Sequence, residues 1–121
     1  MTKSRDVMDA YVGAWNTDDP AERRRLVQRA LTEDAVVAYP NLSAEGQEEI
    51  AAAIGGLHEQ IPGVHFVPTS GIEEHHGWLR ATWRMLEGDG SIRSDGEDVA
   101  EISGDGRFSR VIGFHNPAPP Q

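Results

Sequence analysis

Hydrophobic residues in the first half of the chain recur every three or four positions, which is the spacing of amphipathic helices. Residues 4–15 carry the first such stripe. The pair Asp19-Pro20 then starts a second helix, with a capping residue followed by proline. The stripe of this second helix predicts that Arg23-Arg24-Arg25 face solvent. Ser43 to Gly46 lead into a third helix, which Ile61-Pro62-Gly63 end.

The second half of the chain changes to the period of two that is typical of half-buried strands. A short β-branched strand over Ala35–Tyr39, stopped by a proline, already precedes the third helix. Between Val64 and Glu74, Pro68 and Gly71 interrupt the strand pattern and predict a bend or an edge. The clearest strand spans Trp78–Leu86, and its interior-facing set consists of Leu79, Ala81, Trp83 and Met85.

Two tight turns, Asp89-Gly90 and Asp105-Gly106, separate two further strands that end at His115. Helices followed by antiparallel strands predict an α+β fold. We expect a cone-shaped α+β barrel, with three N-terminal helices packed on a strongly curved mixed or antiparallel β-sheet and an apolar cavity at its open end. The pattern predicts a single domain over 1–121, in which 116–121 form a flexible proline-rich tail.

The charge and composition narrow the range of partners. The formal net charge of -9 argues against nucleic acid and anionic membranes. The absence of cysteine excludes disulfides and thiolate chemistry, and no segment has the apolar length of a signal peptide core or a membrane span. These observations favour the cytoplasm.

Asp98 is the unusual residue of the chain because it falls in the middle of a predicted strand, where aspartate is depleted. It shares a strand face with Gly96, Ala100 and Ile102, which favours an inward, partly desolvated carboxyl with a raised pKa. Such a group can act as a general acid or a hydrogen-bond donor. The alternative is a structural carboxylate that is paired with Arg110 or that faces solvent.

Four short patterns together resemble the nuclear-transport-factor-2-like superfamily, and within it the SnoaL-like polyketide cyclases and the steroid Δ-isomerases. They are Tyr11-x-x-x-Trp15-Asn16, Asp34-Ala35-Val36 leading to Pro40, Gly46-x-x-x-Ile50, and Asp98 before Asp105-Gly106-Arg107. The resemblance covers the chain from about Tyr11 to His115. It implies the cone-shaped fold, whereas the activities of this superfamily range from isomerases and cyclases to pure binding modules.

The resemblance also implies roles for single residues. Tyr11 matches the tyrosine that donates to the oxyanion in the steroid isomerases, and Asp98 matches the protonated aspartic acid beside it. The catalytic aspartate of those isomerases falls on Tyr39, and a phenol is a poor base at neutral pH. The SnoaL-like cyclases use a single acidic residue. We therefore expect an enzyme of this class that assists enolisation of an apolar, carbonyl-bearing ring compound, with Asp98 as acid/base and Tyr11 as oxyanion donor. The alternative is a non-catalytic ligand-binding or dimerisation module that has lost the base.

The walls of the cavity are expected to come from aromatic and aliphatic residues on the inward faces. The interior periodicity of these positions is equally compatible with simple core packing. His115 either points into the open end of the pocket, where its imidazole could act as a base, or is solvated at the strand end. The candidate ligand-binding residues are Trp15, Tyr39, Ile54, Leu57, Trp83, Met85, Val111 and His115.

No cofactor or metal is expected. The spacing of His58, His65, His75 and His76 is not a known ligand pattern, and the chain has no glycine-rich phosphate loop. The expected partners are a small apolar molecule in the cavity and a second copy of the chain. This homodimer would form through the outer sheet face, where Trp78, Thr82 and Leu86 lie between Arg80 and Arg84.

Overall fold

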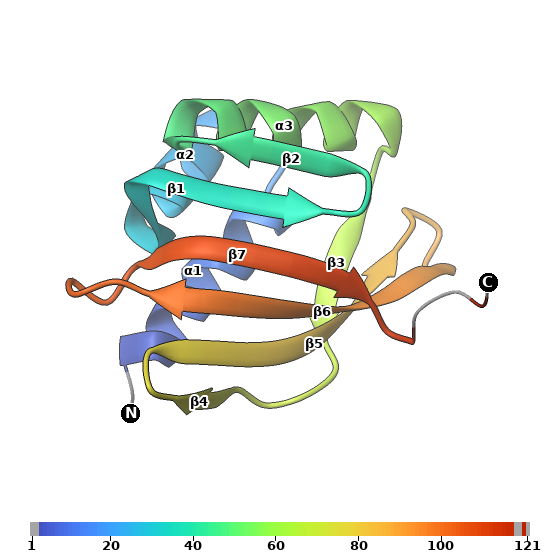
Figure 1. Ribbon diagram of the computed structural model, residues 1–121. Coiled ribbons are helices and arrows are strands. Elements are labelled where there is room, and N and C mark those ends of the chain that lie inside the picture. Colours follow the sequence, from blue (N-terminus) through green and yellow to red (C-terminus); the bar gives the residue numbers. More distant parts are fainter. Residues whose placement is uncertain (1–2, 118–119, 121) are drawn as a thin grey trace.

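Residues 3–117 and 120 are described by the computed structural model, in which helices cover one face of a curved β-sheet (Figure 1). The helices are α1 (Lys3–Asn16), α2 (Pro20–Ala30) and α3 (Gln47–Gln60). The strands are β1 (Leu31–Tyr39), β2 (Leu42–Glu45), β3 (His65–Pro68), β4 (Glu73–His75), β5 (Trp78–Leu86), β6 (Ile92–Ile102) and β7 (Phe108–His115). This architecture confirms the predicted α+β fold.

The strands form one mixed sheet in the order β2-β1-β7-β6-β5-β3, with β4 also paired to β5. Only the β1–β7 pair is parallel among these pairings, and it places the end of the first strand beside the last one. The two turns predicted from Asp-Gly pairs connect the strands of the long antiparallel ladders β5–β6 and β6–β7. In both turns the glycine, Gly90 or Gly106, has a positive φ. The register puts Asp98 opposite Ala81 on one side and Gly113 on the other.

Two strand predictions need correction. The segment Ser43 to Gly46 was expected only to lead into a helix, but β2 (Leu42–Glu45) pairs with β1 and buries Ala44. Its four residues are too few for a recognisable alternation, so only the pairing with β1 reveals the strand. β1 itself begins at Leu31 rather than Ala35, and its register with β7 shifts between Leu31 and Val36.

The start of α2 is as predicted, but one of its arginines is not. Asp19 is the N-cap, and its side chain accepts a hydrogen bond from the Ala21 N–H, 3.1 Å away. Arg23, expected in solvent, is only 5% exposed. Its Nη2 donates to the carbonyl of Thr17 at 2.6 Å, just beyond the end of α1. The guanidinium of Arg23, a residue of α2, therefore binds the backbone just after α1. Helix periodicity within α2 cannot reveal such a contact between two helices.

The end of α1 is attached to β3 by a side-chain amide that forms hydrogen bonds with the backbone of β3. Asn16 donates from Nδ2 to the carbonyl of Phe66 at 2.9 Å, and its Oδ1 accepts from the Phe66 N–H at 2.7 Å. This pair of hydrogen bonds fixes Trp15, the neighbour of Asn16, relative to Phe66. The two rings meet edge to face with centroids 5.6 Å apart. The contact forms one corner of the cavity described below.

The predicted tail at 116–121 falls partly on residues 118, 119 and 121, which lie outside the described residues. Within the described part of the chain, no helix is long and apolar enough to cross a membrane.

Candidate active site

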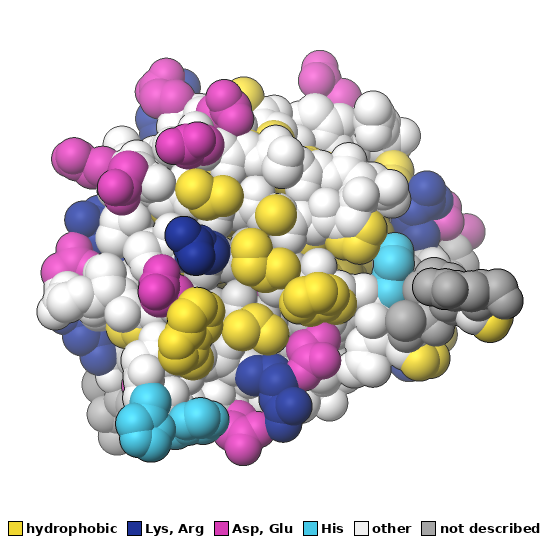
Figure 2. Space-filling view, viewed as in Figure 1, with side chains coloured by type: hydrophobic (Ala, Val, Ile, Leu, Met, Phe, Trp, Pro, Cys, Tyr) yellow, Lys and Arg dark blue, Asp and Glu magenta, His cyan; other side chains and the backbone are white. Residues whose placement is uncertain are grey.

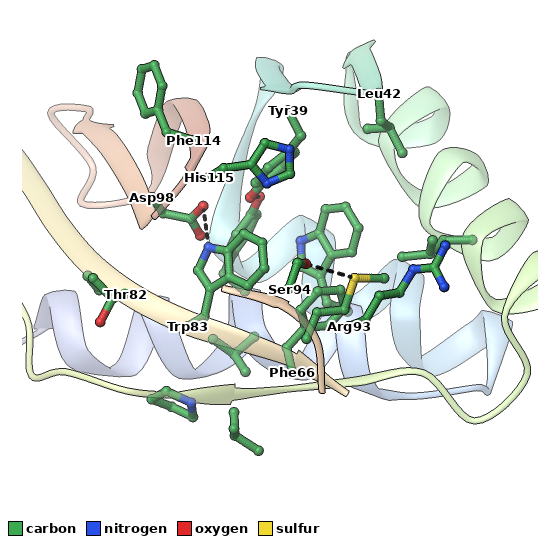
Figure 3. A pocket seen from close by; sticks show the side chains of 18 of the residues that line it. Tyr39, Leu42, Phe66, Thr82, Trp83, Arg93, Ser94, Asp98, Phe114 and His115 are labelled. Atoms are coloured by element: carbon green, nitrogen blue, oxygen red, sulfur yellow. Dashed lines mark hydrogen bonds between the residues drawn. The ribbon is translucent and has the colours of Figure 1, made fainter. Parts of the chain in front are cut away.

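A cavity of about 790 Å³ lies between the helices and the concave face of the sheet (Figure 3). Its size is in the range of sites that bind drug-sized molecules. Most of the residues predicted to form its wall do line it, together with both candidate catalytic residues. They are Trp15, Tyr39, Leu57, Trp83, Met85, His115, Tyr11 and Asp98.

Two predicted wall residues do not line the cavity. Ile54 and Val111 are each 1% exposed and belong to the hydrophobic core. Leu57, one turn after Ile54 on α3, does reach the cavity. The inward faces of the strands and helices are thus shared between the core and the cavity, and a periodic pattern alone cannot divide them.

Asp98 is buried, with 5% of its surface exposed, and it belongs to the cavity wall. Trp83 donates from Nε1 to Oδ1 of Asp98 at 3.0 Å (Figure 3), and the Tyr39 hydroxyl lies near enough to the carboxyl group to act on its pKa as a hydrogen-bond donor. Burial raises the pKa of Asp98 from 3.8 to about 7, although these two hydrogen bonds lower it. Among the described residues no cation forms an ion pair with Asp98, so the alternative of a structural pair with Arg110 is wrong.

Tyr39 connects Asp98 to Tyr11. The two phenol oxygens are 2.5 Å apart, and either can be the donor. Burial, and then the negative charge of Asp98, raise the pKa of both phenols, so both hydroxyls are neutral at ordinary pH. The buried Nε1 of Trp15 has no hydrogen-bond partner within the described residues, but it lies close enough to lower the pKa of Tyr11. The structure thus brings Tyr11 and Asp98 together, but through Tyr39 rather than as two separate donors.

Two glycines, Gly96 and Gly113, make this cluster possible, a role that was not predicted from the sequence. A Cβ at Gly113 would lie 2.1 Å from the ring of Tyr39 and 3.2 Å from Oδ1 of Asp98. A Cβ at Gly96, opposite Trp83 in the register, would lie 2.1 Å from the indole. Each glycine therefore lets a large ring lie flat on the neighbouring strand and reach Asp98. A glycine inside an otherwise strong strand is the sequence signal for such a close approach.

Replacing Gly113 with alanine tests this arrangement. The methyl group would displace the Tyr39 ring, so we expect a loss of about 1–3 kcal/mol in the free energy of unfolding, typical of an overpacked core. Loss of the Tyr39 hydrogen bond should also raise the pKa of Asp98. Urea unfolding and a carboxyl NMR titration measure the two effects. Gly104→Ala is the control, because a Cβ there meets nothing within 4 Å. Equal behaviour of both variants would contradict the role of Gly113.

The other cavity residues were only partly anticipated. His115 is exposed and lines the cavity, and Figure 3 shows its ring on the same side of the cavity as Asp98. Phe66 and Ser94 also line the cavity but were not predicted. The Ser94 hydroxyl has a weak acceptor, Sδ of Met85 at 3.7 Å, which leaves it able to bind a ligand. In the described part of the chain, no three His, Asp or Glu side chains are grouped to hold a metal ion.

The curved sheet, the three helices and the enclosed cavity define a protein of the nuclear-transport-factor-2-like fold class. Residues 8–111 match the family model of the SnoaL-like domain, and the chain belongs to the SnoaL-like family. This confirms the resemblance drawn from the four sequence patterns. No curated protein matches the chain.

Solved structures agree with this assignment. An isomerase candidate of the SnoaL-like family from Agrobacterium tumefaciens str. C58 is 34% identical, with a TM-score of 0.88 over 95% of this chain and 98% of that one. A polyketide cyclase candidate from Sinorhizobium meliloti is 16% identical, with a TM-score of 0.71 over 93% and 99%. A nuclear-transport-factor-2-like protein of unknown function from Exiguobacterium sp. 255-15 is 15% identical, with a TM-score of 0.70 over 88% and 95%. The last two share the fold alone.

Proposed function

We propose that the protein is an enzyme of the isomerase or cyclase type that moves a proton next to the carbonyl group of a small apolar ring compound. The observation that carries this proposal is Asp98, a carboxyl group on the cavity wall whose pKa of about 7 suits proton transfer in both directions at neutral pH. The name of the 34% identical structure, an isomerase candidate of the SnoaL-like family, supports the reaction class.

In this mechanism Asp98 acts first as base and then as acid. The carboxylate, held by Trp83 and Tyr39, removes a proton from the carbon next to the substrate carbonyl. The electron pair of the broken C–H bond moves into the enolate, and the negative charge collects on the substrate oxygen. The neutral carboxyl group then returns the proton to a different carbon. In the cyclase case the enolate carbon instead forms a bond to a second carbonyl carbon of the same molecule, and the carboxyl group gives its proton to the resulting alkoxide. This assignment requires no separate base at Tyr39.

Tyr11 enters the mechanism through Tyr39. While Asp98 is ionised, Tyr39 donates its only proton to Asp98 and accepts one from Tyr11. Once Asp98 holds the substrate proton, its neutral carboxyl group accepts the hydrogen bond from Tyr39 less strongly, and Tyr39 can donate to Tyr11 instead. The Tyr11 proton is then available to the enolate oxygen, so a donor is freed as the negative charge develops. Tyr11 thereby keeps its predicted role as oxyanion donor.

Two phenylalanine variants distinguish the roles of the two tyrosines. Tyr39→Phe removes a hydrogen bond that lowers the pKa of Asp98, so the pH at which the rate is half-maximal should increase. Tyr11→Phe leaves that bond in place and should lower the rate without moving the midpoint. The assay is deuterium incorporation next to the carbonyl of a ring ketone such as 2-tetralone in D2O, followed by NMR. Equal midpoints in both variants would sink the assignment of Tyr39.

One observation favours a second candidate function, a non-catalytic ligand-binding module. Tyr39 stands where the resembled steroid isomerases have their base, and its hydroxyl is engaged by both Tyr11 and Asp98. A chain that had lost the base but kept the cavity would look the same at this position. Absence of deuterium incorporation with every ring ketone that binds would favour this second function.

We also infer that the outer face of the sheet pairs with a second copy of the chain. Figure 2 shows an apolar patch on this face, and the strand registers assign it to Val36, Ala38, Trp78, Val99, Ile112 and Phe114. The sequence predicted an interface centred on β5, but the patch centres on β1, β6 and β7. Thr82 shares this outer face, opposite Glu97 in the register, and its Oγ1 is 2.8 Å from that of Thr69.

Charges around the patch are compatible with a symmetric pair. Arg80 and Arg110 share this face with Glu97 and Glu101, so that both signs border the apolar residues. A two-fold axis through the patch can bring opposite charges of the two copies together. The predicted occupant is thus the chain itself.

Ile112→Lys tests the interface, because it introduces a charge at the centre of the patch. Light scattering should give twice the chain mass of 13.2 kDa for the natural protein and the single mass for this variant. Ile92→Lys is the control, since Ile92 is also exposed, at 58%, but lies outside the patch. A monomeric natural protein, or dissociation by both substitutions alike, would remove the proposal.

A further inference from the structure

Four aromatic rings on the cavity wall form a closed circuit. Trp15 meets Tyr39 with centroids 5.4 Å apart, Tyr39 meets Trp83 at 6.4 Å, Trp83 meets Phe66 at 5.5 Å, and Phe66 meets Trp15 at 5.6 Å. Each contact is close to perpendicular, with interplanar angles of 70° to 80°, as in the adjacent walls of a box. All four rings line the cavity, and Figure 3 labels three of them around it. We call these four residues the aromatic box.

The dimensions of the aromatic box suit a positive charge. The four centroids lie so close together that a cation in the cavity, placed over the circuit, comes within roughly 6 Å of all of them, which is the range of cation–π attraction. Neutral apolar ligands gain contact area from the same rings but nothing from the negative electrostatic potential of their faces. The geometry therefore discriminates by charge as well as by shape.

Asp98 adds a full negative charge at the edge of the box. Two of the four rings, Trp83 and Tyr39, hold its carboxyl group by hydrogen bonds. It is the only carboxyl among the buried polar residues of the described chain, and no cation of that part of the chain pairs with it. A buried carboxylate without a cationic partner is costly, and an organic cation at the box would supply the missing positive charge.

We propose that the cavity binds an organic cation of the alkylammonium class, with its charged group against the cavity side of the aromatic box, beside Asp98. This inference goes beyond the proposed function, because it concerns which molecules bind and holds whether or not a proton is moved.

The other charged groups around the cavity do not oppose such a ligand strongly. The two arginines on its wall are both paired: Arg93 with Glu87 at 3.3 Å, and Arg5 with Asp9 at 3.8 Å. Glu97 adds a negative charge near Asp98, and the formal net charge of the whole chain is -9. Long-range attraction therefore also favours a cationic ligand over an anionic one.

Calorimetry with a matched pair of probes tests the proposal. Choline and 3,3-dimethyl-1-butanol have nearly the same shape and differ in the charge of the central atom. We expect the full chain at pH 8, where Asp98 is ionised, to bind choline at least tenfold more tightly than the alcohol. Lowering the pH to 5.5 should weaken choline binding, because protonation of Asp98 removes the negative charge, and should leave binding of the alcohol unchanged.

Two variants separate the contributions of charge and rings. Asp98→Asn should remove most of the preference for choline, and Phe66→Leu should reduce it while keeping an apolar wall. Equal or tighter binding of the alcohol by the natural protein would overturn the proposal. So would the absence of choline binding at millimolar concentrations, or a preference that survives in both variants. Because calorimetry needs no turnover, these outcomes are independent of the result of the deuterium assay.

Discussion

Asp98→Asn is expected to reduce deuterium incorporation into a ring ketone by about 10²–10⁴-fold, the usual contribution of a general acid or base. The amide has nearly the shape of the carboxyl group and can still accept the hydrogen bond from Trp83, so the fold should be retained. In the natural protein the rate should rise with pH through about 7, as Asp98 loses its proton.

The control for this experiment is Asp95→Asn. Asp95 lies on the same strand but pairs with Arg84 at 2.8 Å and does not line the cavity. Its replacement should leave the rate and its pH midpoint unchanged. Retention of activity in Asp98→Asn, with a normal unfolding transition, would contradict the role of Asp98 as the acid/base.

The second large effect is a change in how stability depends on pH. Asp98 has a pKa of about 7 in the folded chain against an ordinary value of 3.8, so the folded state binds the extra proton between these limits. Its contribution is fully present below about pH 4 and is lost as the pH rises through 7. The difference corresponds to about 4 kcal/mol, and asparagine cannot lose a proton. Asp98→Asn should therefore become progressively more stable than the natural protein from pH 4 to pH 8.

Urea unfolding of both proteins at several pH values measures this difference. The pKa values of Asp89, Asp95 and Asp105 are lowered by their hydrogen bonds, which gives the opposite trend, but these groups are common to both proteins and cancel. Asp95→Asn serves as a control of opposite sign, because it removes a group that stabilises the fold at high pH. A constant difference between Asp98→Asn and the natural protein would mean that the Asp98 pKa is ordinary.

Local patterns in the sequence were sufficient for much of the fold. β5 has the predicted bounds, and the glycines of both Asp-Gly turns have the positive φ that such turns require. In these segments the deciding interactions are between neighbours in the chain. The burial of Arg23 and the existence of β2 depend on contacts with other elements, and both were missed for that reason.

The candidate site shows the same division. Asp98 was found because a carboxyl group in the middle of a strand is unusual, and its burial could be inferred from its apolar neighbours on the same face. Tyr39 was predicted to line the cavity, but its place between Tyr11 and Asp98 could not be inferred, because it depends on the parallel pairing of β1 with β7. This pairing places the Tyr39 ring over Gly113 and its hydroxyl between Tyr11 and Asp98.

The functional consequence is that one carboxyl group serves several purposes. Asp98 organises two rings of the aromatic box, is the acid/base in the proposed reaction, and supplies the negative charge for the proposed cationic ligand. The proposed reaction depends on a carboxyl group that changes its charge near neutral pH, and the proposed cation site depends on the ionised form of the same group. The pKa of Asp98 is therefore the quantity on which the whole account depends.

A carboxyl ¹³C NMR titration of the full chain, labelled at aspartate and assigned by comparison with Asp98→Asn, measures this quantity directly. The account predicts one aspartate signal that titrates near pH 7 and is missing from the variant. An Asp98 signal that titrates near pH 4, like an exposed aspartate, would contradict it.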